Sequence, residues 1–138
     1  MNLRTITKYD YEIYKRINNT NITLEYFDYF INNILNQNHN IYILQKDNNI
    51  IGNVTLIIEH KLTHNGCKMG HIENIIIDEK YRNKGYGVKL MKELVEICKK
   101  NKCYKIILNC DLHLESFYKK NNFITNKLSM ELLIKENF

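Results

Sequence analysis

The six residues Arg82-Asn83-Lys84-Gly85-Tyr86-Gly87 have the types and spacing to hold a phosphate group. A β-branched run ending at Ile77 precedes them, and a helical pattern that reaches Lys100 follows. Two glycines let the backbone approach a ligand closely, and the free N–H groups at the start of a helix attract anions. The stretch therefore predicts a site for a phosphate-bearing ligand, with Arg82, Lys84 and Lys89 as nearby cations. The alternative is a glycine-rich turn with solvated lysines.

The four cysteines give no sign of a metal site or of a disulfide framework. Cys67, Cys98, Cys103 and Cys110 form no C-x-x-C pair, and no histidine stands beside them at a zinc-ligand spacing. Cys98 falls on the apolar stripe of a predicted helix. We expect reduced cysteines in the core and no bound metal.

Length and charge limit the classes of function. A chain of 138 residues fits one domain, and a net charge of +5 suits a phosphorylated small molecule better than nucleic acid. No apolar run approaches the ~20 residues of a membrane span. The first ten residues lack the apolar core of a signal peptide. These features predict a cytoplasmic protein that binds neither nucleic acid nor membranes.

The N-terminal third predicts a short strand and two helices. Leu3–Thr7 alternates as a strand does, and Tyr9–Asn18 has apolar residues at helical spacing. Thr23 is a candidate cap for a second helix, whose apolar stripe includes Phe27 and Ile31. The aromatic side chains of this helix either pack in the core or line a ligand cleft.

The remaining pattern predicts a mixed sheet. Strands are expected at 41–45, 50–61, 67–78 and 103–110, the first two as a hairpin with a bulge at Gly52. The helix after the glycine turn would connect the last two of these strands as a right-handed parallel βαβ unit. A short helix at Leu112–Asn121 and an extended segment at Phe123–Ile134 complete the chain. The fold class is thus α/β, a mixed central sheet flanked by helices, in a single domain over 1–138.

Several blocks of the sequence resemble a known family. The pattern Arg82-x-x-Gly85-x-Gly87 after a strand resembles the acetyl-coenzyme A motif of the GNAT acetyltransferase superfamily. Four further blocks resemble, in order and spacing, the glucosamine 6-phosphate N-acetyltransferases: TLIIEHK (Thr55–Lys61), GHIEN (Gly70–Asn74), CYKIIL (Cys103–Leu108) and FYKKNNF (Phe117–Phe123). The resemblance implies a GNAT fold, a homodimer, and transfer of acetyl from acetyl-CoA to the amine of D-glucosamine 6-phosphate in UDP-N-acetylglucosamine biosynthesis.

The same resemblance implies roles for particular residues. Tyr118 would protonate the departing thiolate, and a backbone N–H near Asn74 or Ile75 would stabilise the oxyanion. The implied acetyl-CoA contacts are Ile75, Ile76, Ile77, Arg82, Asn83, Lys84, Gly85, Tyr86, Gly87, Val88, Tyr118 and Lys120. The implied sugar-phosphate contacts are Thr20, Lys61, His64, Glu73, Asn74, Tyr104 and Lys105.

Two positions depart from the family pattern. Asn74 and Asn109 stand where the family has carboxylates thought to face the amine. An amide orients a nitrogen or a water through its carbonyl, but it takes no proton at neutral pH. These departures leave open an acetyltransferase for another amine, such as a protein N-terminus, and a non-catalytic relative that binds acyl-CoA.

Overall fold

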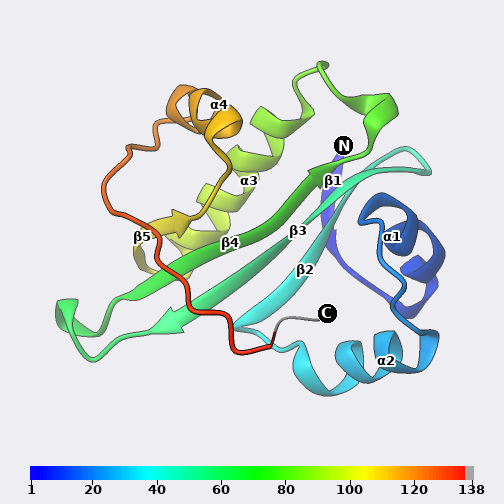
Figure 1. The fold of residues 1–138 in the computed structure, drawn as a ribbon, viewed down its shortest axis with the longest axis horizontal. Helices are drawn as coiled ribbons and strands as arrows, with labels where there is room; N and C mark the ends of the chain where they lie inside the picture. The colour runs from blue at the N-terminus through cyan, green and yellow to red at the C-terminus, as the bar shows by residue number, and fades with distance from the viewer. Residues whose placement is uncertain (136–138) are drawn as a thin grey trace. The chain divides into compact units, whose positions relative to one another are not determined.

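Five strands form one sheet in the computed structural model, which describes residues 1–135 of the chain (Figure 1). Their order is β1-β2-β3-β4-β5; β1 to β4 are antiparallel neighbours, and β4 and β5 are parallel. The strands are β1 (Asn2–Thr5), β2 (His39–Lys46), β3 (Asn49–His60), β4 (Lys68–Ile77) and β5 (Cys103–Leu108). The predicted mixed sheet and parallel βαβ unit are confirmed.

The helices begin largely where the sequence predicts. They are α1 (Tyr11–Ile17), α2 (Leu24–Tyr29), α3 (Tyr86–Lys100) and α4 (Glu115–Lys120). Thr23 caps α2, since its hydroxyl accepts a hydrogen bond from the N–H of Tyr26. A 3₁₀ turn, Lys8–Asp10, replaces the first turn of the predicted N-terminal helix, because Thr7 and Asp10 form a capping box around it.

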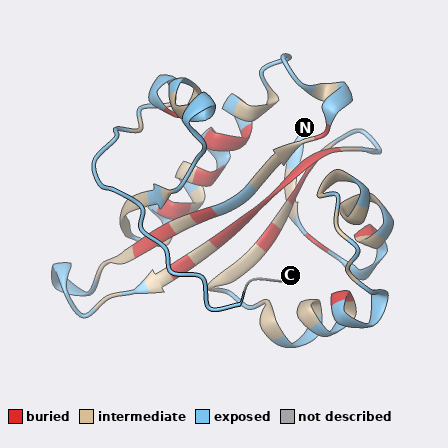
Figure 2. Ribbon diagram, in the orientation of Figure 1, coloured by how far each residue is buried: buried red, intermediate tan, exposed pale blue. Residues whose placement is uncertain are grey.

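The helices of residues 1–108 cover both faces of the sheet. Phe27 of α2 packs with Ile41 and Ile43 of β2 on one face. On the other face Gly70 of β4 lies against the Sγ of Cys98 in α3, with Leu56 of β3 beside it. Figure 2 shows the buried residues running along the central strands and the sheet-facing side of α3. The alternation along each strand therefore separates two apolar layers.

A bulge lies beside Gly52, as the sequence predicts. Leu44 pairs with Gly52 and Gln45 pairs with Ile50, so Ile51 is the extra residue of β3. The hairpin is otherwise regular from His39 of β2 to the turn before Asn49.

The chain divides into two compact units, Met1–Leu108 and Asn109–Phe138. The second unit holds a 3₁₀ turn, Leu112–Leu114, followed by α4. The expectation that residues 1–138 form one domain stays a prediction.

The C-terminal third differs from the sequence pattern in two respects. The segment predicted as extended, Phe123–Ile134, pairs with no strand in the described residues, and its Leu128 and Ile134 side chains are mostly exposed. A strand needs a neighbour for its N–H and C=O groups, and the apolar pattern alone supplies none. The strand predicted at 103–110 ends at Leu108 and is only half buried, since β4 alone pairs with it in the described residues.

All four cysteines are free thiols, but they differ in burial. Cys98 is buried as predicted, and burial raises the pKa of its thiol to about 12. Cys110 is exposed, which corrects the expectation of a core position. Within residues 1–135 no group of three or more histidine, cysteine or acidic side chains gathers where it could hold a metal ion. No helix in the same range is long and apolar enough to cross a membrane.

Candidate active site

A bulge in β4 is the central feature of the site. Thr55 pairs with Glu73 and Asn53 pairs with Ile76, so two residues of β4, Asn74 and Ile75, oppose one residue of β3. Asn74 has a left-handed backbone with φ of 49°. Asparagine is among the few residues other than glycine that adopt this conformation readily. An asparagine at position 74 therefore suits the local backbone.

Among residues 1–135, no strand pairs with the β5-facing edge of β4 beyond Ile72. The parallel pairing of the two strands ends at Ile72 and Leu108. In the described residues that edge of Glu73–Ile77 is therefore open. Backbone groups on such an edge can bind an extended ligand as a further strand would. The predicted contacts of the pantetheine arm, Ile75, Ile76 and Ile77, belong to this stretch of β4. The carbonyl of Ile76 faces Gly52 of β3, and that of Ile77 accepts a hydrogen bond from Arg82.

The glycine turn leads directly into α3. Gly85 is the N-cap residue, has φ of 84°, and makes no side-chain cap bond. A Cβ atom there would meet no atom within 4 Å, so the space above the turn is open. The first turn of α3 contains no acidic residue, and Asn83, Lys84, Gly85 and Val88 are exposed. The structure thus provides the accessible helix start that a phosphate group needs.

Arg82 braces this turn. Its Nε donates to the carbonyl oxygen of Ile77 at 2.9 Å, which joins the end of β4 to the residues before α3. Asp78, between them, is 5% exposed and accepts a hydrogen bond from Arg16 of α1 at 2.9 Å. The hydrogen bond from Arg16 lowers the pKa of the Asp78 carboxyl. These contacts hold the strand-to-turn junction in place.

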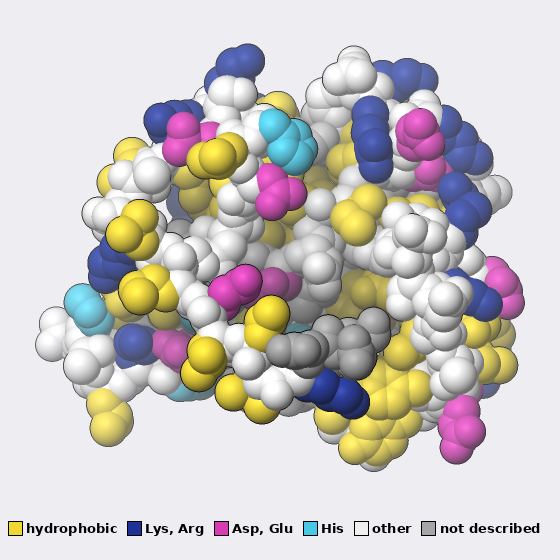
Figure 3. All heavy atoms as spheres, viewed as in Figure 1, with side chains coloured by type: hydrophobic (Ala, Val, Ile, Leu, Met, Phe, Trp, Pro, Cys, Tyr) yellow, Lys and Arg dark blue, Asp and Glu magenta, His cyan; other side chains and the backbone are white. Residues whose placement is uncertain are grey.

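Lysines surround two tyrosines at the turn. The rings of Tyr81 and Tyr86 meet edge to face, with centroids 6.2 Å apart. Figure 3 shows Lys and Arg side chains gathered at the upper right, over the turn that leads into α3. The ammonium groups that lie within about 6 Å of one of the two rings belong to Lys46, Lys80, Lys84 and Lys89. Lys46 was missed by sequence reasoning, because it comes from the end of β2.

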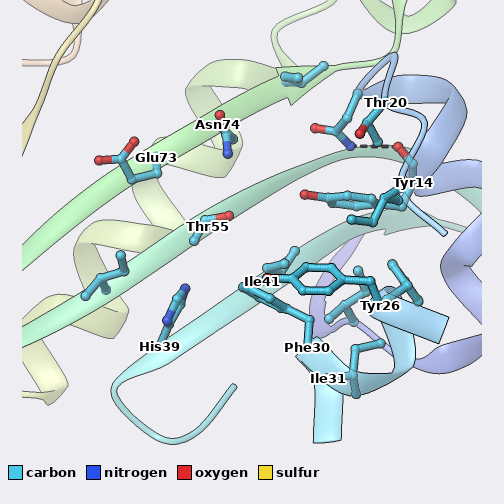
Figure 4. Close-up of a pocket in the computed structure, with 16 residues that line it drawn as sticks. Tyr14, Thr20, Tyr26, Phe30, Ile31, His39, Ile41, Thr55, Glu73 and Asn74 are labelled. Atoms are coloured by element: carbon cyan, nitrogen blue, oxygen red, sulfur yellow. Dashed lines mark hydrogen bonds between the residues drawn. The ribbon is translucent and has the colours of Figure 1, made fainter. Parts of the chain in front are cut away.

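A pocket of about 480 Å³ opens beside the bulge (Figure 4). Glu73 and Asn74 reach it from β4, and Thr20 reaches it from the loop after α1, so three predicted substrate contacts meet there. The sequence left open whether the aromatic side chains of the second helix pack in the core or line a cleft. Phe27 is a buried core residue that also borders the pocket, and Tyr26 and Phe30 line the pocket as well. Its lining residues are Ile6, Tyr14, Asn18, Thr20, Ile22, Tyr26, Phe27, Phe30, Ile31, His39, Ile41, Thr55, Ile57, Glu73, Asn74 and Ile76. None of them is a lysine or an arginine.

The other predicted substrate contacts form a separate cluster. The rings of His64 and Tyr104 stack with centroids 4.1 Å apart, and the Nζ of Lys105 lies 5.5 Å from the Tyr104 ring. Lys61, at the same end of β3, pairs with Glu59 at 3.1 Å.

This cluster lies well away from the pocket. Lys105 pairs with Met69 of β4, whereas Glu73 stands four residues further along the strand. At ~3.3 Å per residue, about 13 Å separate the two levels. The structure therefore brings Thr20, Glu73 and Asn74 together, and separately His64, Tyr104 and Lys105.

The second unit contains the predicted proton donor. Tyr118 of α4 is 6% exposed, and its ring meets those of Phe117 and Phe123 edge to face. Burial, and then the nearby Cys110 thiol, raises the pKa of the Tyr118 phenol. Lys120 is exposed at the end of α4. Asn109 is also exposed and follows β5, which corrects its predicted place inside the strand.

A mixed sheet with a bulged strand, an open edge and a glycine turn at a helix start is typical of one class of transferases. The model of the acetyltransferase (GNAT) family matches residues 9–123. The glucosamine 6-phosphate N-acetyltransferase 1 of Dictyostelium discoideum is 31% identical over 127 residues, 89% of this chain and 81% of that protein. The chain therefore belongs to the GNAT acetyltransferase family and, within it, to the glucosamine 6-phosphate N-acetyltransferase family.

Other relatives match over shorter stretches. The glucosamine 6-phosphate N-acetyltransferase of Trypanosoma brucei brucei is 35% identical over 92 residues, 67% of this chain and 63% of that protein. A probable glucosamine 6-phosphate N-acetyltransferase 2 of Oryza sativa subsp. japonica is 34% identical over 86 residues, 62% of this chain and 52% of that protein. The chain spans about half to two thirds of the length of these two relatives.

Solved structures share the fold. The crystal structure of glucosamine-6-phosphate N-acetyltransferase from Arabidopsis thaliana has a TM-score of 0.88 and 26% identity, and the match covers 97% of this chain and 98% of that chain. A transcriptional regulator from Bacillus halodurans has a TM-score of 0.85 at 18% identity over 96% of this chain and 99% of that chain, which shows the fold alone.

Proposed function

We propose that the chain transfers the acetyl group of acetyl-CoA to the amine of D-glucosamine 6-phosphate, and forms N-acetyl-D-glucosamine 6-phosphate and CoA. The observation that carries the proposal is the open edge of β4 at Glu73–Ile77, directly followed by the exposed start of α3. The names of the relatives support the choice of acceptor. The product would feed the synthesis of UDP-N-acetylglucosamine in the cytoplasm.

The donor suits the residues at the turn. A pantetheine arm is an extended chain with two amides, and the backbone groups of Ile75–Ile77 that point away from β3 can pair with them. The pyrophosphate would lie at the N–H groups from Asn83 to Val88, with Lys84 and the guanidinium of Arg82 as cations. The space for the pyrophosphate is open, because even a Cβ atom on Gly85 would meet no atom within 4 Å.

In the reaction the acetyl group passes from sulfur to nitrogen, and one proton passes from nitrogen to sulfur. The amine nitrogen attacks the thioester carbonyl, the C–S bond breaks, and an amide forms. A backbone N–H at Asn74 or Ile75 would stabilise the oxyanion, and the phenol of Tyr118 would protonate the thiolate. The amine proton passes to water, which restores the Tyr118 phenol, so the net transfer is from nitrogen to sulfur. Burial raises the pKa of Tyr118, which keeps this proton donor neutral at physiological pH.

The acceptor amine would enter the pocket beside the bulge. The Glu73 carboxylate attracts an ammonium, which loses one proton to water before the free amine attacks, while the Asn74 and Asn109 amides can orient a nitrogen or a water. Thr20 would contact the sugar. Lys61, His64, Tyr104 and Lys105 are the proposed phosphate contacts, in keeping with the preference of a phosphate for paired cations.

We also propose a homodimer. The separation of about 13 Å between the levels of Glu73 and Lys105 along β4 is longer than a hexose phosphate. A second subunit would supply the remaining phosphate contacts, or would place its own phosphate-binding cluster beside the pocket of the first subunit, so that both contact one sugar. The exposed apolar residues of 128–134 are a suitable surface for pairing. Light scattering tests the mass, and a monomer at micromolar concentration would contradict the proposal.

The pocket favours a second candidate acceptor, an amine with an apolar body. Its lining is mainly aromatic and aliphatic, it holds the carboxylate of Glu73, and it includes no lysine or arginine that would balance a phosphate. A primary arylalkylamine would place its ammonium at Glu73 and its ring among Tyr14, Tyr26 and Phe30.

A thiol-release assay separates these functions. The purified chain with acetyl-CoA is offered glucosamine 6-phosphate, glucosamine, a peptide with a free N-terminus, and 2-phenylethylamine. Turnover at least tenfold faster with the phosphosugar than with the others supports the first proposal. A preference for 2-phenylethylamine supports the second candidate. Tight CoA binding without turnover on any amine contradicts both and indicates a non-catalytic acyl-CoA-binding relative. Glu73→Gln, which keeps the shape but removes the charge, should raise KM for the preferred amine.

A further inference from the structure

A buried and a half-buried amide, those of Asn53 and Asn18, lie behind the bulge of β4. The Nδ2 of Asn18 donates to the Oδ1 of Asn53 at 2.8 Å, and the Nδ2 of Asn53 donates back to the Oδ1 of Asn18 at 3.3 Å. Asn53 lies in β3 and is 1% exposed. Asn18 is the C-cap residue of α1. Helix and sheet are thus joined by a reciprocal amide pair with no charge.

The pair contacts backbone on both sides. The Nδ2 of Asn53 also donates to the carbonyl oxygen of Asn74 at 3.4 Å, and the Nδ2 of Asn18 donates to the carbonyl oxygen of Tyr14 at 2.8 Å (dashed line in Figure 4). One amide therefore reaches the left-handed residue of the bulge, and the other reaches the last turn of α1. A chain of hydrogen bonds connects the two.

Such support is needed at this place. The bulge interrupts the ladder between β3 and β4, so the regular pairing does not fix the backbone of Asn74 and Ile75. A left-handed residue other than glycine persists only where its surroundings hold it. A primary amide suits the position because it donates and accepts at once, which no aliphatic side chain of the same size can do.

We propose that the Asn18–Asn53 pair is a positioning element that holds the bulge at Asn74 and so aligns the backbone N–H groups that would stabilise the oxyanion. The inference rests on the proposed function for its catalytic consequence. Asn18 and Asn53 act through the backbone of residues 74 and 75 and do not contact the reacting atoms.

The variant Asn53→Asp tests this directly. A carboxylate of the same shape cannot donate to the carbonyl of Asn74, whereas its protonated form can. The protonated fraction of this carboxyl grows as the pH falls. Because burial raises the pKa of a carboxyl, this protonation occurs at a higher pH than for an exposed aspartate. We expect kcat to fall at least ~10-fold at pH 8. The ratio of variant to wild-type kcat should rise towards one as the pH is lowered to about 6. KM for acetyl-CoA should change far less than kcat.

The neighbours of position 53 bear on this pH dependence. Among the titratable or charged groups of the packed elements, Tyr14 of α1 and Glu73 of β4 line the pocket beside the bulge, and Arg16 of α1 is engaged by Asp78. The pairing residue on β2 is apolar, Ile43. Ile43→Val is therefore the matched control: it perturbs the same level of the sheet and should leave kcat and its pH profile unchanged.

Folding and positioning are separated by a second variant and a second measurement. Asn18→Ala removes the partner of Asn53 from a half-buried position and should lower kcat at every pH. NMR should show shifted backbone amide resonances of Asn74 and Ile75 in both variants, with an otherwise native spectrum.

Each outcome is decisive. An Asn53→Asp enzyme with a wild-type pH profile and unshifted amides at 74 and 75 would overturn the inference. If the wild type acetylates no amine, the proposed function fails, and the amide resonances alone then decide whether the pair holds the bulge.

Discussion

The carbonyl oxygen of Ile76 occupies the space that a Cβ atom on Gly52 would need. Gly52 pairs with Ile77 across β3 and β4, so the absence of a side chain lets the two strands meet closely along the stretch of β4 whose opposite edge is open. The same residue borders the bulge between β2 and β3.

Gly52→Ala should therefore disturb both stability and donor binding. The added methyl group meets backbone, which moves less easily than a side chain, and overpacking of this kind costs about 1–3 kcal/mol. Urea unfolding measures the loss of stability, and calorimetric titration measures the weakened binding of CoA. Gly66→Ala is the control, because its φ of 74° should also cost stability, while Gly66 lies in the β3–β4 loop and a Cβ there meets no atom of β4. Equal CoA affinity in both variants would contradict the role of this edge.

Gly85→Ala should weaken acetyl-CoA binding without a packing clash. The site has room for a methyl group, but φ of 84° is a left-handed conformation. An L-residue pays roughly 1–2 kcal/mol there, which corresponds to about a tenfold change in affinity if the bound turn needs this backbone. Steady-state kinetics should show a higher KM for acetyl-CoA and a similar kcat. An unchanged KM would show that the turn does not hold the pyrophosphate.

Tyr118→Phe should lower kcat by about 10²-fold, the lower range for loss of a positioned acid. The ring contacts with Phe117 and Phe123 remain, so stability should be close to that of the wild type. Because burial raises the pKa of the phenol above its usual value of 10, the proposed proton donor is lost in the wild type only at strongly alkaline pH. Tyr9→Phe, at a position that is 85% exposed, is the control. A Tyr118→Phe enzyme with the wild-type kcat would remove Tyr118 from the mechanism.

Asp10 should make the fold sensitive to acid. Desolvation by burial raises the pKa of its carboxyl, but hydrogen bonds from Arg4 and from the N–H of Thr7 outweigh it, and the net shift is downward. The unfolded chain then binds the proton more tightly than the folded one. The stabilisation is complete above the ordinary aspartate pKa of about 4 and is lost as the pH falls through the lower folded value.

Asp10→Asn tests this contribution. The variant should lose about 1–3 kcal/mol at pH 7, since it weakens the contact with Arg4 and the cap. Its free energy of unfolding should also depend less on pH between about 5 and 2. Parallel acid-induced unfolding curves for variant and wild type would contradict the assignment.

Local patterns predicted the strand, turn and helix that are proposed to bind the donor. The apolar stripe of α3 and the β-branched run before it are each encoded within a few residues, so the strand, turn and helix follow from the sequence. Thr23 likewise predicts the start of α2, because a cap residue and the N–H group that it accepts from, here that of Tyr26, are only three residues apart.

Features that depend on distant partners were not predictable in this way. The left-handed backbone of Asn74 depends on its register with β3, and Asn53 finds its partner 35 positions away in α1. The separation of Lys105 from Glu73 follows from pairing along β4, which a linear motif does not contain. A polar residue between Gly52 and Val54 in an apolar strand was the available signal for the amide pair, since buried polar groups need partners.

The lysines around Tyr81 and Tyr86 have a consequence for kinetics. Exposed charges act over about 8 Å at physiological ionic strength, and they accelerate the encounter with an oppositely charged molecule. Salt should therefore slow the association of a polyanionic donor, while its dissociation, governed by short contacts with the backbone of the turn, should change little. The Nζ of Lys46 lies 3.4 Å from the hydroxyl oxygen of Tyr86. Substitution of Lys46 should therefore change the association rate of the donor more than its dissociation rate.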